Sequence, residues 1–175
     1  QAGSTKVLQK MNRRYSKEQY LEKVEKVYEA VADIALTTDI MVGFPGETEE
    51  DFLETLDVVE RARFDSAFTF IFSPRDGTLA ARMEDQVPAE VKAERFERLV
   101  ELQNRISLEK NSALVGKVLP AFVEGSSKKG DGLLAARTRT NKVVNFPGKK
   151  ELVHSLVNIR IEEAHAHHLM GRLAE

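Results

Sequence analysis

Apolar and polar positions in the first part of the chain recur with the periods of helices and strands in turn. Residues 16–31 carry an apolar stripe at helical spacing, and Ser16 with Gln19 forms a capping box at its start. Residues 34–42 are a short run rich in β-forming residues. Such a run predicts a strand that is apolar on both faces.

The same alternation continues after a sharp break at Gly43–Gly46. Thr48 caps a second helix with an acidic first turn, and residues 66–72 form a second β-rich run. A strand, a helix and a strand joined by short links predict a βαβ unit with parallel strands and a right-handed crossover. A long helix with Pro88 in its first turn is expected next.

From about residue 114 the pattern changes to short β-like runs separated by glycine-rich turns. Five such runs in about 60 residues predict a small barrel or sandwich of OB-like size. We therefore divide the chain into domains 1–113 and 114–175. The five expected strands are Val115–Glu124, Leu133–Thr140, Val143–Phe146, Leu156–Glu162 and His168–Leu173.

Composition narrows the class of protein. Hydrophobic residues make up 42% and charged residues 31%, as in a soluble globular protein. No run approaches the roughly 18 uninterrupted apolar residues of a membrane span, so we expect a cytoplasmic protein with no membrane partner. The chain has no cysteine, which excludes disulfides, thiolate nucleophiles and cysteine-ligated metals within it. A start at Gln1 without an initiator methionine predicts a fragment of a longer protein.

The net charge of −2 is unevenly distributed. Residues 1–113 carry 16 Lys/Arg and 22 Asp/Glu, whereas residues 114–175 carry 10 and 6. A basic second domain behind an acidic first one suggests that the second part meets a polyanion. An ordinary solvated surface of mixed sign is the alternative.

Candidate ligand-binding residues of the first domain lie where its predicted strands end, because parallel α/β barrels place their working face there. Asp39 is a carboxylate in an apolar strand, so it needs a ligand or a hydrogen-bonded structural partner. The turn at Gly43–Gly46 does not suit phosphate, because three acidic residues follow it. It either lets a nucleoside or amino acid approach the backbone or is a plain turn. Arg75 and the pair Arg13–Arg14 could each bind an anion or simply stay solvated.

The second domain holds a segment suited to sugar and phosphate contacts, Arg137–Phe146. On a strand, Arg137 and Arg139 would share one face, and Phe146 is expected in the core. The histidines at 165–168 favour a terminal strand with exposed imidazoles over a metal site. The candidate nucleic-acid-binding residues are Lys128, Lys129, Arg137, Arg139, Asn141, Lys142 and Asn145.

Motifs along essentially the whole chain resemble those of the radical-SAM methylthiotransferase family. Gln1–Ser4 resembles a Gln-Ser-Gly-Ser strand end, and Met11–Tyr15 resembles Met-x-Arg-Arg-Tyr. Thr38–Thr48 is similar to Thr-Asp-Ile-x-Val-Gly-Phe-Pro-Gly-Glu-Thr, and Phe68–Thr78 to Phe-Thr-Phe-x-Tyr-Ser-Pro-Arg-x-Gly-Thr. Arg137–Phe146 resembles the Arg-Thr-x-x-Asn-Lys/Arg-x-Val-Asn-Phe signature that the tRNA-modifying branch carries on its TRAM domain.

The resemblance implies an α/β fold, the C-terminal part of a radical-SAM (βα) barrel, followed by a small all-β, OB-like TRAM domain. It implies an enzyme that uses S-adenosylmethionine and two 4Fe-4S clusters to add a methylthio group at C2 of N6-isopentenyladenosine beside the tRNA anticodon. The cluster cysteines would precede Gln1, so this chain by itself should ligate no cluster and should be inactive. Family position makes six residues cofactor-binding candidates: Gln1, Ser4, Arg13, Asp39, Gly43 and Arg75.

The resemblance also implies partners, and it leaves alternatives open. The expected partners are the tRNA anticodon stem-loop and the missing N-terminal half of the same protein, and we expect a monomer. An RNA-binding module without catalysis remains an alternative, as does a methylthiotransferase with a different substrate. Arg63 stands at a helix end where the family usually has glycine, which requires a left-handed non-glycine residue or a different cap.

Overall fold

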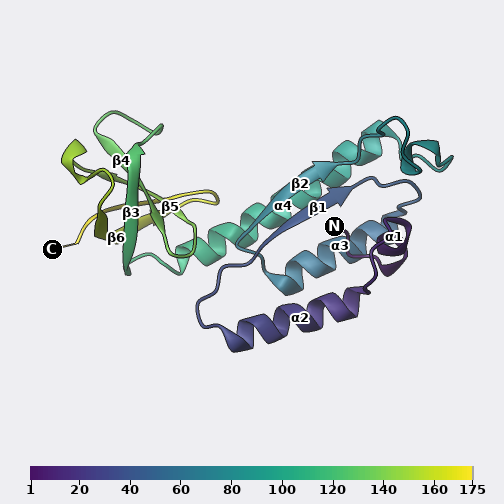
Figure 1. The fold of residues 1–175 in the computed structure, drawn as a ribbon, viewed down its shortest axis with the longest axis horizontal. Helices are drawn as coiled ribbons and strands as arrows, with labels where there is room; N and C mark the ends of the chain where they lie inside the picture. Colours follow the sequence, from purple (N-terminus) through teal and green to yellow (C-terminus); the bar gives the residue numbers. More distant parts are fainter. Residues whose placement is uncertain (175) are drawn as a thin grey trace. The chain divides into compact units, whose positions relative to one another are not determined.

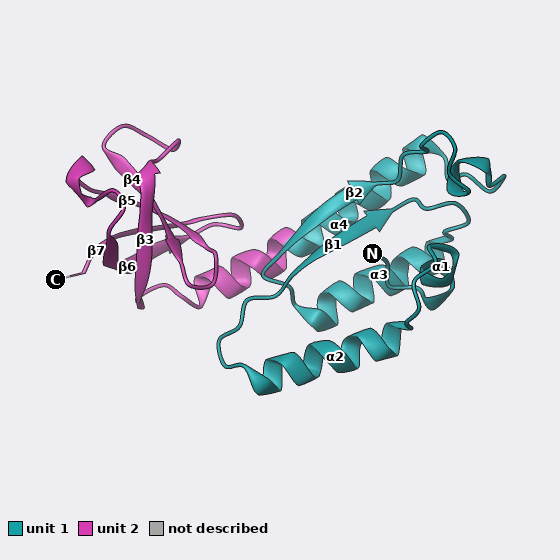
Figure 2. Ribbon diagram, in the orientation of Figure 1, with its two compact units in different colours: residues 1–103 teal, residues 104–175 magenta. Residues whose placement is uncertain are grey.

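The chain divides into two compact units, residues 1–103 and 104–175, in a computed structural model that describes residues 1–174 (Figure 2). The division falls within helix α4 (Ala89–Ser112), so it lies earlier than the domain boundary drawn from the sequence. That boundary stays a prediction, and each unit is described by itself.

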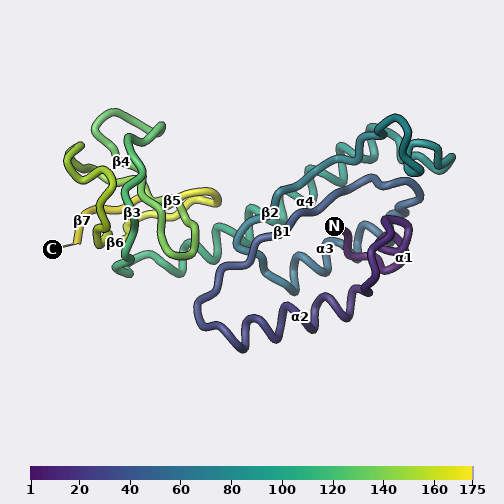
Figure 3. Tube along the Cα trace, in the orientation of Figure 1, coloured from purple at the N-terminus to yellow at the C-terminus, as the bar shows by residue number. Residues whose placement is uncertain are grey.

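The first unit is a two-stranded parallel sheet with helices beside it (Figures 1 and 3). β1 pairs with β2 in parallel, which confirms the expected βαβ unit. A short helix, α1, was not expected from the sequence. The elements of this unit before α4 are α1 (Thr5–Lys10), α2 (Lys17–Ala30), β1 (Thr37–Val42), α3 (Glu49–Ala62), β2 (Ser66–Ile71) and η1 (Ala80–Arg82).

The predicted helix starts are confirmed. The Ser16 hydroxyl accepts a hydrogen bond from the Gln19 backbone amide, and the Gln19 side-chain oxygen accepts one from the Ser16 backbone amide. These two hydrogen bonds complete a capping box at α2. Thr48 caps α3 in the same reciprocal way with Asp51. Arg63 ends α3 in the left-handed conformation, with φ of 48°. The chain therefore uses the conformation that glycine would adopt at lower cost.

The expectation of a strand that is apolar on both faces is wrong. β1 begins only at Thr37, and Asp39 is exposed. The register places Asp39 beside Phe68 of β2, on a sheet face where Phe68 keeps 67% of its surface exposed. The opposite face is covered, because Ile40 and Val42 are buried there. The first unit thus presents one open sheet face.

The second unit is a closed five-stranded barrel with strand order β3-β4-β5-β7-β6, which confirms the small β-domain. All neighbouring strands are antiparallel except β5 and β7. The core is continuous and includes Phe146, as expected, which is fully buried. The elements are β3 (Val118–Ser126), β4 (Leu133–Thr138), β5 (Val143–Pro147), η2 (Lys150–Leu152), β6 (Leu156–Ala164) and β7 (Leu169–Leu173).

Two details of the predicted strands are wrong. β4 ends at Thr138, so Arg139 lies in the turn that follows rather than on the strand. The histidines at 165–168 lie in the turn between β6 and β7 rather than on a terminal strand. None of the helices within residues 1–174 is long and apolar enough to cross a membrane.

Candidate functional site

Three of the six cofactor candidates lie close together at the open sheet face of the first unit. The Gln1 carbonyl accepts a hydrogen bond from the Met41 amide of β1 at 2.9 Å. Burial, together with the charge of Arg13, lowers the pKa of the Gln1 ammonium group, and Asp39 acts in the opposite direction. The Asp39 carboxylate forms no hydrogen bond or ion pair between side chains of the described residues. Arg13 and Asp39 are therefore exposed beside a partly buried Gln1, and the Asp39 carboxylate is not hydrogen-bonded to another side chain of the described residues.

The other three candidates are placed differently. Ser4 is buried, caps α1 and donates its hydroxyl to Asp51 at 2.7 Å. Gly43 is buried with φ of 76°, and its amide donates to the Glu47 carboxylate at 2.9 Å. A Cβ at Gly43 would lie 2.4 Å from the side chain of Lys92, so the turn requires glycine. Arg75 is exposed after β2, and no hydrogen bond or ion pair joins it to the other five candidates within the described residues.

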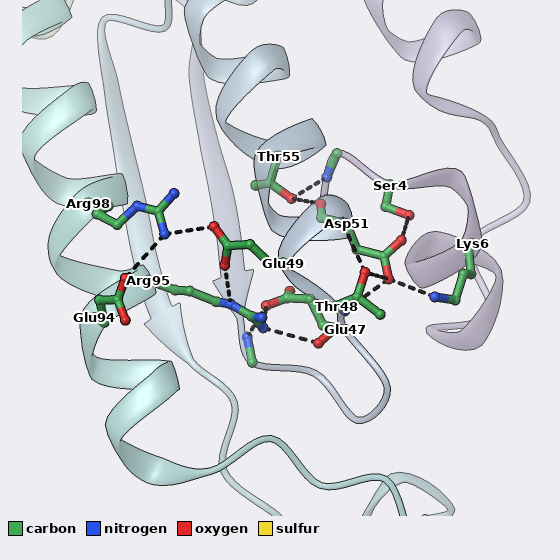
Figure 4. A network of polar contacts seen from close by, with 12 residues as sticks. Ser4, Lys6, Glu47, Thr48, Glu49, Asp51, Thr55, Glu94, Arg95 and Arg98 are labelled. Carbon is green, nitrogen blue, oxygen red and sulfur yellow. Dashed lines mark hydrogen bonds and ion pairs between the residues drawn. The ribbon is translucent and has the colours of Figure 1, made fainter.

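The carboxylate of Asp51 accepts hydrogen bonds from residues at the start of α1 and from the residue that caps its own helix, α3 (Figure 4). Ser4, Lys6 and Thr48 all donate to it, with the Lys6 ammonium at 2.8 Å. Burial would raise the pKa of Asp51, but hydrogen bonds from Lys6, Thr48 and Ser4 outweigh it and lower the pKa to about 2. Asp51 therefore fixes α1 against the start of α3 as an anion at neutral pH.

A second cluster in Figure 4 centres on a buried ion pair between the turn after β1 and α4. Arg95 Nη1 lies 2.9 Å from Glu47 Oε1, and the two side chains are only 6% and 1% exposed. Arg95 also donates to the Glu47 carbonyl and contacts Glu49 at 3.4 Å. Burial raises the pKa of Glu47, although the Gly43 amide and Arg95 oppose the shift. The pair holds the Gly43–Glu47 turn in place from within.

Sequence reasoning did not single out either cluster. Glu47 and Asp51 stood among several acidic residues at the start of α3, and their neighbours Glu49 and Glu50 are exposed. The one available signal was the reciprocal cap, since Asp51 stands three residues after Thr48. Nothing local marks Arg95, which reaches Glu47 across 48 positions of sequence.

Three cationic candidates of the second unit, Lys128, Lys129 and Arg137, border a hollow of about 520 Å³. Lys128 and Lys129 lie in the exposed loop between β3 and β4, and both line this hollow. Asn145 also lines it, yet its side chain is buried and accepts a hydrogen bond from Ser127 at 2.7 Å. Asn145 therefore orders the loop that carries the two lysines.

Arg137 and Arg139 differ in how much of their charge is available. Arg137 contacts both carboxylate oxygens of Glu124, at 2.7 and 3.0 Å, and donates to Asn141. The side-chain hydrogen bond from Arg137 lowers the pKa of Glu124, which keeps the pair charged and mutually neutralised. Arg139 is exposed and has no side-chain hydrogen bond or ion pair among the described residues. Arg139 is thus the freer cation, although both line one hollow of about 480 Å³.

The remaining candidates have structural contacts of their own. Asn141 adopts φ of 62° in the turn between β4 and β5. The Lys142 ammonium donates to Asn111 of α4 at 2.9 Å. Asn111 is itself buried and donates to the carbonyls of His165 and Ala166. These contacts tie the β6–β7 turn to the end of α4.

The histidines of the β6–β7 turn form a stacked pair rather than a ligand set. The rings of His165 and His168 lie 4.4 Å apart and are nearly parallel. Burial and the neighbouring His165 lower the pKa of His168, with a smaller effect from Lys129. Within residues 1–174, no group of three or more metal-ligating side chains is placed to hold a metal ion.

Two protein-family models match the chain, one in each part. Residues 1–59 match the Radical SAM superfamily, and residues 112–174 match the TRAM domain. The first part of the chain is therefore similar to the Radical SAM superfamily and the second part to the TRAM domain, the two similarities that the sequence motifs led us to expect.

Its relatives extend this similarity over the full chain. It is 59% identical over 175 residues to the tRNA-2-methylthio-N(6)-dimethylallyladenosine synthase of Thermoanaerobacter sp. (strain X514), which covers 100% of this chain and 37% of that protein. Proteins of the same name match at 57% over 173 residues in Acetivibrio thermocellus and at 52% over 171 residues in Clostridium botulinum (strain Hall). These matches cover 99% and 98% of this chain, and 36% and 38% of the relatives. The chain thus spans little more than a third of the relatives it matches.

Proposed function

We propose that this chain is the C-terminal part of a radical-SAM tRNA methylthiotransferase, which adds a methylthio group at C2 of N6-isopentenyladenosine beside the anticodon. The observation that carries the proposal is 59% identity to one relative over all 175 residues, a match that includes both units. In this proposal the first unit contributes to a cofactor site, and the second unit binds tRNA in the cytoplasm.

The candidate residues at the open sheet face fit part of an S-adenosylmethionine site. The unengaged carboxylate of Asp39 can accept hydrogen bonds from amino or hydroxyl groups, and Arg13 and Arg75 are exposed cations that suit a carboxylate. Bound there, the cofactor would supply the radical and group-transfer chemistry of the family. The chain has no cysteine, so its residues do not fit a 4Fe-4S cluster, and we derive no step through one.

Ser4 and Gly43 would support this site indirectly, by positioning neighbouring segments, rather than by contact with the cofactor. The Ser4 hydroxyl is engaged by Asp51, and the Gly43 amide is engaged by Glu47. Both residues therefore position the N-terminal segment and the turn after β1. Direct contacts to the cofactor would come from Gln1, Arg13, Asp39 and Arg75.

The second unit would bind the phosphates of tRNA through its exposed cations. Lys128, Lys129 and Arg139 are all exposed. Because Glu124 already matches the charge of Arg137, Arg137 should contribute less than Arg139. The amides of Asn141 and Asn145 and the Lys142 ammonium order the surrounding loops, and their contribution to RNA affinity would be mostly indirect.

A salt series tests the RNA-binding proposal. The probe is a tRNA anticodon stem-loop, and the readout is the dependence of its affinity for this chain on salt concentration. Arg139→Ala should weaken binding and reduce the slope of log K against log salt by about one, because one phosphate contact is lost. Arg137→Ala should reduce the slope by less. Lys26→Ala, in an exposed pair with Glu22 on α2, is the matched control.

The outcomes separate the hypotheses. Absence of binding at low salt, or an unchanged slope in Arg139→Ala and in Lys128→Ala/Lys129→Ala, contradicts the proposed tRNA contact. A module that only binds RNA would show these slopes without any cofactor affinity. Calorimetry of S-adenosylmethionine with the longer protein therefore decides between the two. Asp39→Asn should weaken that affinity, and Asp76→Asn, which changes an exposed carboxylate after β2, should not.

A further inference from the structure

One wall of the barrel carries apolar side chains that the core does not use. Phe122 of β3 keeps 42% of its surface exposed and Leu156 of β6 keeps 75%. The register places Leu156 on one side of Phe122 and Arg137 of β4 on the other. The three side chains therefore form a single row across three neighbouring strands. The inward residues Ala121 and Val123, which flank Phe122, are buried, so the row points outward from the barrel.

The row lies in a hollow and is extended by an aromatic neighbour. Phe122 and Leu156 line the hollow of about 480 Å³, together with Arg139 and the exposed Asn158. The imidazole of His154 stacks beside the Phe122 ring, with centroids 6.4 Å apart and planes 15° from parallel. The surface thus combines two nearly parallel flat rings with the Leu156 side chain, and the Arg139 guanidinium, which has no ion pair within residues 1–174, lines the same hollow.

The charges around this surface favour an anionic occupant. Glu124 is the nearest acidic residue on β3, and Arg137 neutralises it through two contacts. Arg139, which has no ion-pair partner in the described part of the chain, then adds positive charge to the same hollow. A ligand with flat apolar faces and negative charges at their edges complements this arrangement, and an unpaired nucleotide has both features. A duplex hides its base faces and offers only the phosphates.

We propose that Phe122, His154 and Leu156 form a stacking surface for an unpaired RNA base, whose neighbouring phosphate is held by Arg139. The proposal rests on the RNA-binding function above and adds where an unpaired base is bound. Stacking on aromatic side chains tolerates any base, because every base has a flat face. This surface therefore supports binding of single-stranded RNA segments rather than readout of a particular sequence.

Fluorescence of a single-stranded RNA nonamer that contains 2-aminopurine tests the proposal with the full 175-residue chain. Binding of the wild-type chain should change the 2-aminopurine emission, because the probe leaves its neighbouring bases and stacks on the protein. Phe122→Ala should weaken the affinity about tenfold, as expected for loss of one base–aromatic stack. The salt slope should stay the same, because no phosphate contact is removed. Phe122→Trp should restore affinity and the emission change.

Controls separate stacking from folding and from general RNA binding. Leu173→Ala removes another partly exposed apolar side chain of the barrel, on β7, and should leave affinity unchanged. Circular dichroism and melting check that each variant folds. If Phe122→Ala does not fold, Leu156→Ser, which removes a mostly exposed side chain of the same surface, replaces it and should also weaken the affinity.

Three results overturn the proposal. The first is equal affinity of Phe122→Ala and wild type for the nonamer while the wild type binds tRNA. The second is an equal loss of affinity for a blunt RNA duplex. The third is RNA-free self-association that Phe122→Ala abolishes, which would assign the wall to a second copy of the chain. Failure of the wild type to bind any RNA would instead refute the proposed function itself.

Discussion

At the scale of single residues, many polar side chains near the candidate sites form hydrogen bonds that stabilise the fold. Asp51 is the clearest case, because donors from Ser4, Lys6 and Thr48 surround its carboxylate. Its pKa is lowered from 3.8 to about 2. A carboxyl group with a lower pKa in the folded state stabilises the protein above its unfolded pKa and loses that contribution as pH falls toward the folded value.

Asp51→Asn should therefore lower the free energy of unfolding at pH 7 by about 1–2 kcal/mol, after allowance for solvent screening. The deficit relative to the wild type should shrink as the pH falls from about 4 toward about 2, where the wild-type carboxylate takes up its proton. Urea unfolding at several pH values measures it, with Asp76→Asn as the control. A deficit that stays constant down to pH 2 would contradict the assigned hydrogen bonds.

Asn141 is a residue whose backbone conformation matters as much as its side chain. It adopts φ of 62° and accepts a hydrogen bond from Arg137 through its amide oxygen. Asn141→Ala should cost about 1–2 kcal/mol of stability, because an alanine pays the left-handed penalty without the hydrogen bond. Asn141→Gly, which tolerates that conformation, should recover most of the loss in thermal unfolding. Equal losses in the two variants would show that strain is not the cause.

At the scale of elements, the first unit depends on an ion pair that joins the turn after β1 to α4. Arg95 and Glu47 are both buried, and Glu47 Oε2 has no hydrogen-bond partner within the described residues. Removing one partner of a buried pair leaves an uncompensated charge, which typically costs about 3–5 kcal/mol. Replacing either residue alone should therefore destabilise the fold more than replacing both residues together.

Arg95→Met should lower the free energy of unfolding by about 3 kcal/mol or more, because Glu47 would keep its buried carboxylate without a counterion. Adding Glu47→Gln to that variant should recover at least half of the loss. Denaturant unfolding of the two single variants and the double variant measures the coupling. Arg98→Met, whose side chain is 34% exposed, is the matched control and should cost much less. A double variant as unstable as Arg95→Met would refute the coupling.

Elements defined by local signals could be predicted from the sequence. The capping residues at Ser16 and Thr48 mark helix starts because their hydrogen bonds span only three positions. The five strands of the barrel were visible as alternating runs between turns. The strand ends were less accessible, since the left-handed Asn141 sets the turn that removes Arg139 from β4.

The features of the candidate sites that could not be predicted are those set by distant parts of the chain. Whether Asp39 is buried or exposed depends on which segment covers that face of the sheet. The sequence of the strand itself contains no information about the covering segment. Arg137 and Glu124 pair because the register of β3 and β4 brings them together across 13 positions. Sequence reasoning found the cationic residues but could not separate matched charges from free ones. It also missed the exposed position of Phe122, because apolar residues in strands usually face a core.

At the scale of the whole molecule, the open sheet face of the first unit exposes large apolar side chains. Phe68 and Phe70 of β2 lie on this face, beside Asp39 and Met41, and are 67% and 48% exposed. Contiguous exposed apolar surface and an unpaired strand edge promote association between chains. The monomer expected from the sequence stays a prediction.

Sedimentation should show association of this chain that increases with concentration. Phe68→Ser/Phe70→Thr should reduce it, because the exposed apolar side chains on β2 are replaced by polar ones while the strand can still form. Val27→Thr on α2 removes an exposed apolar residue elsewhere and serves as the control. A chain that stays monomeric at high concentration, or that associates equally in the double variant, would contradict this role of β2.

The amide of Asn111 bears on how the β-barrel can be excised as an independent module. The Asn111 amide donates to the carbonyl of His165 in the turn between β6 and β7, and its oxygen accepts from the Lys142 ammonium. Asn111 lies on α4, which precedes the strands of the barrel and could be mistaken for a linker. A gene fragment that starts at residue 114 would lose these hydrogen bonds. One that starts before Asn104 would keep them, so the barrel should be cloned with the last two turns of its preceding helix attached.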